Sequence, residues 1–176
     1  MRRPVALLAG CGLLAACSSM TLRSPTASAN LGPTKGNQAA GNVIFIQHGE
    51  KVVVDARITG LTPGLHGFHV HEKGDCTAPD AMSAGAHFNP HKAPHAGPDS
   101  PQRHAGDLGN LTADANGVAV YHVEVSGITL GTGPDSIIGR SVIVHANPDD
   151  LRTQPSGNAG PRIACGLISK GKDQWF

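Results

Sequence analysis

The chain has 176 residues, of which 39% are hydrophobic and only 3% aromatic, and it contains 23 glycines and 13 prolines. This length suits one domain with its own core, and the composition favours short strands joined by many turns over a helical bundle. The 14 basic and 13 acidic residues form no basic stripe or acidic block, so the sequence gives no support for nucleic-acid binding.

The N-terminal segment is predicted to be a targeting sequence. Arg2 and Arg3 precede an apolar run, PVALLAGCGLLAA, which is too short to span a bilayer and ends in small residues. The run leads into Cys17, and the letters LAAC resemble the lipobox of bacterial lipoproteins. That resemblance implies a signal peptide at residues 1–16, a lipidated Cys17 and a lipid anchor on the extracytoplasmic side of a membrane, in the periplasm or at the cell surface. The alternative is an ordinary secretory signal that is cut after Ala29.

Residues 17–38 are polar and rich in Ser, Thr and Pro, which is typical of a flexible tether, so we expect the folded domain to span 39–176. Within it, apolar and polar residues alternate over 51–59 and over 118–125, as in half-buried strands. Further strand-like runs are NVIFIQ, GFHVH, SVIVHA and RIACGLIS. No segment shows helical periodicity over three turns. The pattern predicts an all-β, antiparallel sandwich or barrel.

The run GFHVH contains two histidines with strand spacing. Successive side chains of a strand point to opposite faces, so Phe68 and Val70 are expected to face the core, and His69 and His71 the other side. A third histidine, His145, ends the run SVIVH. Three imidazoles from two strands would form a nitrogen-rich site suited to copper.

A long stretch between Glu72 and Asp107 has little strand or helix pattern, and a loop of this length is usually functional or pinned by a ligand. It carries four histidines before the aspartate, namely His87, His91, His95 and His104. Three imidazoles and one carboxylate make a good tetrahedral zinc site, and a bound cation would also hold the loop in place.

Two cysteines remain after the N-terminal segment is set aside, because Cys11 would leave with the signal peptide and Cys17 would be lipidated. Outside the cytoplasm, Cys76 and Cys165 are expected to form a disulfide. The alternative is a pair of thiolates that bind a metal.

Five motifs together resemble the Cu/Zn superoxide dismutase family from about Ala39 to Ser169: HGFHVHEKGDC, GAHFNP, RHAGDLGN, VIVHANPDDL and GNAGPRIACG. The resemblance implies an eight-stranded antiparallel Greek-key barrel with a long metal-binding loop. It also implies an enzyme, monomeric or homodimeric, that converts two superoxide anions to dioxygen and hydrogen peroxide. Copper would cycle between Cu(II) and Cu(I), and zinc would be structural, with one ion of each per subunit.

The resemblance assigns roles to individual residues. It implies that copper is bound by His69, His71, His87 and His145, and zinc by His87, His95, His104 and Asp107. His87 would bridge the two metals and act in catalysis as a proton carrier, and Arg162 would receive the anionic substrate beside the copper. Asp149 would link a ligand of each metal, and the Cys76–Cys165 disulfide would tie the long loop to the last strand.

The remaining histidines are expected to lie outside the metal sites. His66 is predicted to hold a loop by hydrogen bonding, His48 and His122 to be exposed on strands, and His91 to be a solvent-facing or auxiliary residue.

The segment 150–162 is shorter than the charged loop of the best-known eukaryotic members, so the field that attracts the substrate should be arranged differently. The alternative function is a non-catalytic, copper- and zinc-binding envelope lipoprotein. A missing copper ligand or a missing arginine would favour that reading, and all of these residues are present.

Overall fold

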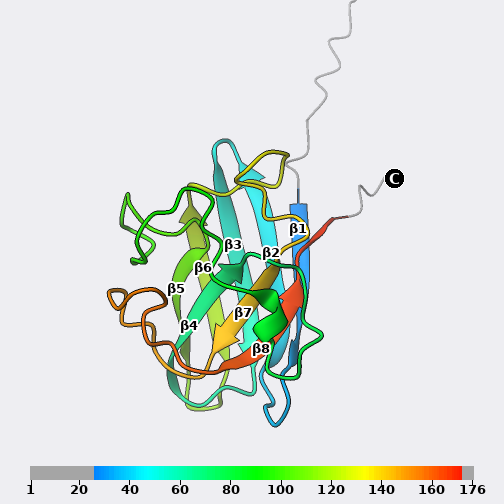
Figure 1. Cartoon of the computed structure of the whole chain (residues 1–176). Helices are drawn as coiled ribbons and strands as arrows, with labels where there is room; N and C mark the ends of the chain where they lie inside the picture. Colours follow the sequence, from blue (N-terminus) through cyan, green and yellow to red (C-terminus); the bar gives the residue numbers. More distant parts are fainter. Residues whose placement is uncertain (1–25, 172–176) are drawn as a thin grey trace, which may run out of the picture.

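The computed structural model of the chain describes residues 26–171, whose regular secondary structure consists almost entirely of β-strands (Figure 1). In chain order these are β1 (Thr26–Pro33), β2 (Ala40–His48), β3 (Lys51–Thr59), β4 (Gly64–His71), β5 (Asp107–Ala113), β6 (Ala119–Val125), β7 (Ser141–His145), β8 (Arg162–Leu167) and β9 (Ser169–Lys170). The only helical segment in this part of the chain is the 3₁₀ turn η1 (Met82–Ala84). No helix within residues 26–171 has both the length and the apolar character needed to cross a membrane.

Eight of the strands close into an antiparallel barrel. Their order is β2-β3-β6-β5-β4-β7-β8-β1, and the pairing of β1 with β2 completes the ring, while the two-residue β9 adds to β1. The chain leaves β3, which lies between β2 and β6, and enters β4, which lies between β5 and β7. The chain crosses again from β6, which lies between β3 and β5, to β7, which lies between β4 and β8. These two crossings make the topology a Greek key, so the predicted architecture is confirmed.

Strand β1 corrects the prediction that the flexible tether extends to residue 38. Thr26–Pro33 pairs with β2 along six residue pairs and also with β8. Its alternate residues Ala27, Ala29 and Leu31 are buried in the core. The sequence conceals this strand because its inward residues are mostly small, and Ser, Thr and Asn stand between them. The predicted signal peptide, Cys17 and the first part of the tether lie outside the described residues.

The alternating pattern predicted for β3 and β6 is confirmed. Val52, Val54, Ala56 and Ile58 of β3 all face the core, as do Ala119 and Val125 of β6. Phe68 of β4 is fully buried and meets the edge of the Tyr121 ring, with the ring centres 5.6 Å apart. Complete burial of a side chain of this size stabilises the fold by about 1.5–3 kcal/mol. β4 is therefore fixed at the centre of the barrel wall.

The long loop between β4 and β5 is bound to β4 at Val70. Phe88 N donates to Val70 O at 2.8 Å, Val70 N to Gly106 O at 2.9 Å, and Gly106 N to Phe88 O at 2.9 Å. A Cβ atom added to Gly106 would lie 2.2 Å from Val70 O, so this close approach requires glycine. Both arms of the loop, green in Figure 1, are thus held on the outside of the barrel.

Candidate metal centre

Four buried histidines meet on the outer side of β4. His69 and His71 lie on β4 itself, and His145 ends the neighbouring strand β7. His87 comes from the long loop and forms an isolated bridge with His71. Each of the four offers one ring nitrogen, and these nitrogens lie within 4.8 Å of one another. The structure therefore brings together all the histidines that the sequence suggested for copper.

The rings of this group are held in fixed orientations through their other nitrogens. These contacts are His69 Nε2 to Asp149 Oδ2 at 2.8 Å, His71 Nδ1 to Gly85 O at 3.0 Å, and His145 Nδ1 to Gly160 O at 3.0 Å. An acceptor at one ring nitrogen keeps the proton there, so the opposite nitrogen presents its lone pair.

The inward nitrogens fit a transition-metal ion. His69 Nδ1 and the Nε2 atoms of His71, His87 and His145 are buried and have no hydrogen-bond partner among the described residues. A buried nitrogen without a partner costs about 1–3 kcal/mol, so four such atoms converging at one point would be strongly unfavourable without a ligand. Copper, which prefers imidazole nitrogen, would satisfy all four together.

A second group surrounds Asp107, the first residue of β5. Its carboxylate oxygens lie 2.9 Å from His87 Nδ1, 3.0 Å from His95 Nδ1 and 3.3 Å from His104 Nδ1. The four residues offer ligand atoms within 4.8 Å of one another, and all four are buried. Three imidazoles with one carboxylate are a donor set typical of zinc. His87 belongs to both groups, with Nδ1 facing Asp107 and Nε2 facing the other histidines.

Asp149 connects the two groups directly. Its Oδ2 lies 2.8 Å from His69 Nε2, and its Oδ1 lies 2.9 Å from His95 Nε2. Asn110 holds the backbone of Asp149 on both sides, because its Oδ1 accepts from Asp149 N at 2.7 Å and its Nδ2 donates to Asp149 O at 2.9 Å. The sequence analysis missed Asn110, although this residue ends the motif RHAGDLGN.

Burial keeps the histidines of the first group neutral. It lowers the pKa of His69 to about 4, against an opposing hydrogen bond from Asp149, and lowers the pKa of His145 to about 3. The pKa values of His71 and His87 are also lowered, again mainly by burial. Neutral imidazoles are the form that binds a metal, so the site is ready for one at neutral pH.

The carboxylates have the opposite effect in the second group. Burial tends to lower the pKa of His95, but hydrogen bonds to Asp107 and Asp149 outweigh it and raise this pKa to about 9. Burial alone would raise the pKa of each carboxyl, yet the surrounding histidines hold the pKa of both aspartates well below the ordinary value. Zinc bound at this group would therefore displace a proton from His95.

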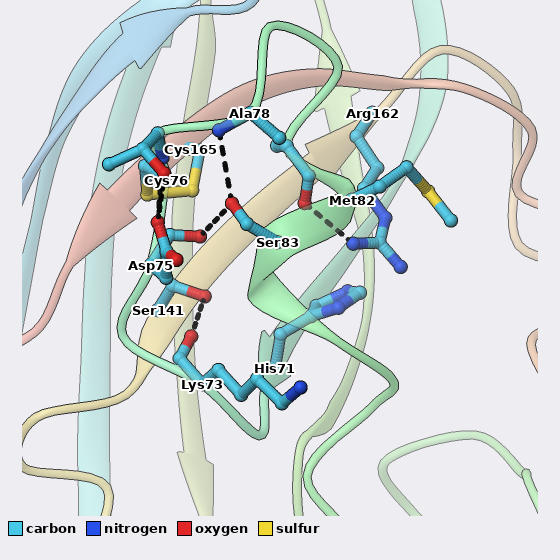
Figure 2. Close-up of a disulfide and its surroundings, with 12 residues drawn as sticks. His71, Lys73, Asp75, Cys76, Ala78, Met82, Ser83, Ser141, Arg162 and Cys165 are labelled. Carbon is cyan, nitrogen blue, oxygen red and sulfur yellow. Dashed lines mark hydrogen bonds between the residues drawn. A yellow bond between two sulfur atoms is a disulfide. The ribbon is translucent and has the colours of Figure 1, made fainter.

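Arg162 opens β8 and lies in the wall of a cavity of about 630 Å³, which is also lined by His71, His87 and His145. Its Nη1 donates to Ala81 O at 2.7 Å and its Nη2 to Gly85 O at 2.6 Å. Figure 2 shows the guanidinium near His71, with one of its hydrogen bonds drawn as a dashed line. The predicted anion-binding residue thus shares one cavity with three of the histidines proposed for copper.

The Cys76–Cys165 disulfide predicted from the resemblance is present, and it joins the long loop to β8 with the two Cα atoms 5.8 Å apart. Closing a loop of 89 residues corresponds to about 4–5 kcal/mol in the chain-entropy description. Ser83 reinforces this corner, since its Oγ donates to Asp75 O at 2.9 Å and accepts from Ala78 N at 3.1 Å (Figure 2). The disulfide therefore supports the segment whose carbonyl groups hold Arg162.

The remaining histidines lie where the sequence placed them. His66 is buried, with Nδ1 2.9 Å from His145 O and Nε2 2.8 Å from Thr62 O, so it ties the turn before β4 to the end of β7. His48 and His122 are exposed on β2 and β6. His91 is exposed and lies 2.6 Å from Asp135 Oδ1, outside both histidine groups.

Comparison with protein families gives one match over most of the chain. The family model described as Copper/zinc superoxide dismutase (SODC) matches residues 39–168. The matched region contains both histidine groups, both disulfide cysteines and Arg162. Strand β1 lies before it.

Proposed function

The chain belongs to the copper/zinc superoxide dismutase family, whose members are copper- and zinc-dependent oxidoreductases, and from that premise we propose that it removes superoxide in the cell envelope. Two superoxide anions would be converted to dioxygen and hydrogen peroxide outside the cytoplasm. The observation that carries the proposal is the convergence of four buried, unpartnered imidazole nitrogens beside a second metal-type group that shares His87.

We assign the ligands by the nitrogens that face each group. Copper would be held by His69 Nδ1 and by the Nε2 atoms of His71, His87 and His145, and zinc by His87, His95, His104 and Asp107. Bound copper supplies one-electron chemistry between Cu(II) and Cu(I), and zinc has no redox chemistry. Asp149 would keep His69 and His95 oriented, because it contacts the outer nitrogen of both rings.

The chain's own residues then handle charge and protons. Arg162 binds the superoxide anion at the cavity wall, where the carbonyl groups of Ala81 and Gly85 keep its guanidinium in place. His87 would act as the proton carrier: Nδ1 stays directed at Asp107, and Nε2, whenever it is released from the copper position, can take up a proton from solvent and donate it to the second superoxide as that anion is reduced. The second proton comes from solvent.

The envelope location rests on two features. The segment before Cys17 resembles a lipoprotein signal, and a disulfide is typical of oxidising compartments. Cleavage after Ala29, the alternative, would remove half of a strand whose Ala27 and Ala29 are buried in the core. We therefore favour cleavage before Cys17 and a lipid anchor attached through that residue.

Purified protein loaded with copper and zinc tests this function. We expect one equivalent of each metal per chain. In pulse radiolysis, the rate constant of superoxide decay should rise in proportion to the concentration of the protein. A protein that takes up both metals and leaves superoxide decay unchanged would instead be a metal-storage lipoprotein. The fixed position of Arg162 in the cavity wall argues against storage, since a positively charged guanidinium repels the cations that a storage protein would bind.

A further inference from the structure

Gln154 exchanges two hydrogen bonds with the backbone of His95. His95 N donates to Gln154 Oε1 at 2.8 Å, and Gln154 Nε2 donates to His95 O at 2.9 Å. The side-chain amide thus imitates a strand neighbour, which likewise exchanges both bonds with one residue. Gln154 itself is on the surface, in the segment between β7 and β8.

His95 has no other backbone support. It lies in the long loop, outside every strand, and within residues 26–171 its backbone N–H and C=O bond to Gln154 alone. Its ring is completely buried between Asp107 Oδ2 at 3.0 Å and Asp149 Oδ1 at 2.9 Å. The backbone position that orients this ring is therefore fixed by Gln154, from the segment between β7 and β8.

The segment that carries Gln154 is shaped around the same contact. Gly157 has a φ of +65°, and an added Cβ atom there would lie 1.8 Å from Asp149 Oδ1 and 2.7 Å from His95 Nε2. Pro155 and Ser156, which directly follow Gln154, line the cavity that contains Arg162. One short segment thus touches the zinc-type group on one side and forms the cavity wall on the other.

We propose that Gln154 is a positioning residue that holds His95 in place for zinc and fastens the cavity wall to the zinc site. This rests on the assignment of His95 to zinc given above. Without the amide, the His95 backbone loses both of its hydrogen-bond partners. Part of the free energy of zinc binding is then used to order the loop, so zinc binds more weakly. Residues that orient a metal ligand typically change metal affinity by 10–100-fold.

The test compares zinc binding by full-length Gln154→Met and Gln102→Met. Methionine has nearly the length of glutamine and forms neither hydrogen bond. Gln102 is a matched control, since it is exposed, stands two residues before His104, and its side chain makes no hydrogen bond within the described chain. Zinc affinity is measured by competition with a chromophoric chelator, and the site is also read from the visible absorption bands of bound Co(II).

We expect Gln154→Met to bind zinc roughly tenfold more weakly and to alter the cobalt bands, while Gln102→Met behaves as the wild type. Gln154→Asn keeps the amide but is one methylene too short to exchange both bonds, so it should show the same loss. This second variant shows whether the loss comes from the missing hydrogen bonds to His95 or only from the missing polar group. Both positions are on the surface, so the variants should fold.

Unchanged zinc affinity and cobalt bands in Gln154→Met, with only a lower stability of the metal-free chain in urea, would refute the role of Gln154. The amide would then serve the fold alone, and the proposed zinc site would stand. A wild-type chain that binds no zinc would overturn the zinc site and this inference together.

Discussion

Replacing Arg162 with alanine removes the guanidinium that lines the cavity beside His71, His87 and His145. The change takes away two hydrogen bonds, to Ala81 O at 2.7 Å and Gly85 O at 2.6 Å, and a positive charge close to His71. Neither carbonyl belongs to a proposed metal ligand, so both metals should stay bound. A charge-assisted hydrogen bond to the substrate is worth about 1.5–3 kcal/mol, which corresponds to a roughly 10–150-fold lower second-order rate constant.

Pulse radiolysis measures this constant, and metal analysis of the same sample shows whether copper and zinc are retained. The rate of Arg162→Ala should also depend less on ionic strength than the wild-type rate, because salt screens the charge that has been removed. Arg162→Glu should be slower still, and its rate should rise with added salt. Arg152→Ala is the control, since Arg152 is exposed in the same segment and does not line the cavity. A fully active, normally salt-sensitive Arg162→Ala would move the anion site elsewhere.

Three further predictions concern zinc, the anchor and pH. Asp107→Ala should lower zinc content and the melting temperature and leave partial activity with a steeper pH dependence, since the four copper-type nitrogens remain; normal zinc content would remove Asp107 from the site. Cys17→Ser should keep its activity and move from the membrane to the soluble fraction, and a variant that stays with the membrane contradicts the anchor. The metal-free chain should lose stability below pH 6.5. Burial lowers the pKa of His69 to about 4 and of His145 to about 3, whereas both titrate near 6.5 in the unfolded chain. The stability that these neutral rings provide above pH 6.5 is therefore lost as the pH falls towards the lowered values. Each group contributes about 1.4 kcal/mol per pH unit, and urea unfolding at pH 7 and pH 5 that gives equal stabilities would refute this.

Local patterns in the sequence were enough to predict most of the barrel and to place His69 and His71 on the same face of their strand. Val52, Val54, Ala56 and Ile58 recur at every second position and fill the core. The placement of His69 and His71 follows from the same two-residue period, since Phe68 and Val70 occupy the core. The clustering of the loop residues His87, His95 and His104 could not follow from periodicity. It came from the spacing of family motifs, and the structure supplies the reason, because both arms of the loop bond to Val70.

The sequence failed where the physical cause is a contact between distant residues. Strand β1 buries two alanines and a single leucine, so its hydrophobic signal is weak, and its pairing with β2 and β8 stabilises it. Asn110 and Gln154 act through hydrogen bonds to backbone atoms 39 and 59 residues away. A backbone acceptor has no residue type, so no sequence pattern identifies the partner of such an amide.

The Cys76–Cys165 disulfide connects the proposed location outside the cytoplasm with the position of Arg162 in the cavity. Cys76 is bonded to Cys165, three residues after Arg162 on β8, so the bond joins the strand that carries the guanidinium to the loop that orients it. Reduction would release the loop segment that includes Ala81, and with it a carbonyl group that holds Arg162. Metal binding through His69 and His145 depends less on this corner, because these rings are held by Asp149 and Gly160 instead. Loss of the disulfide should therefore weaken the anion site before the copper site, as expected for a protein in the proposed location outside the cytoplasm, where disulfides persist.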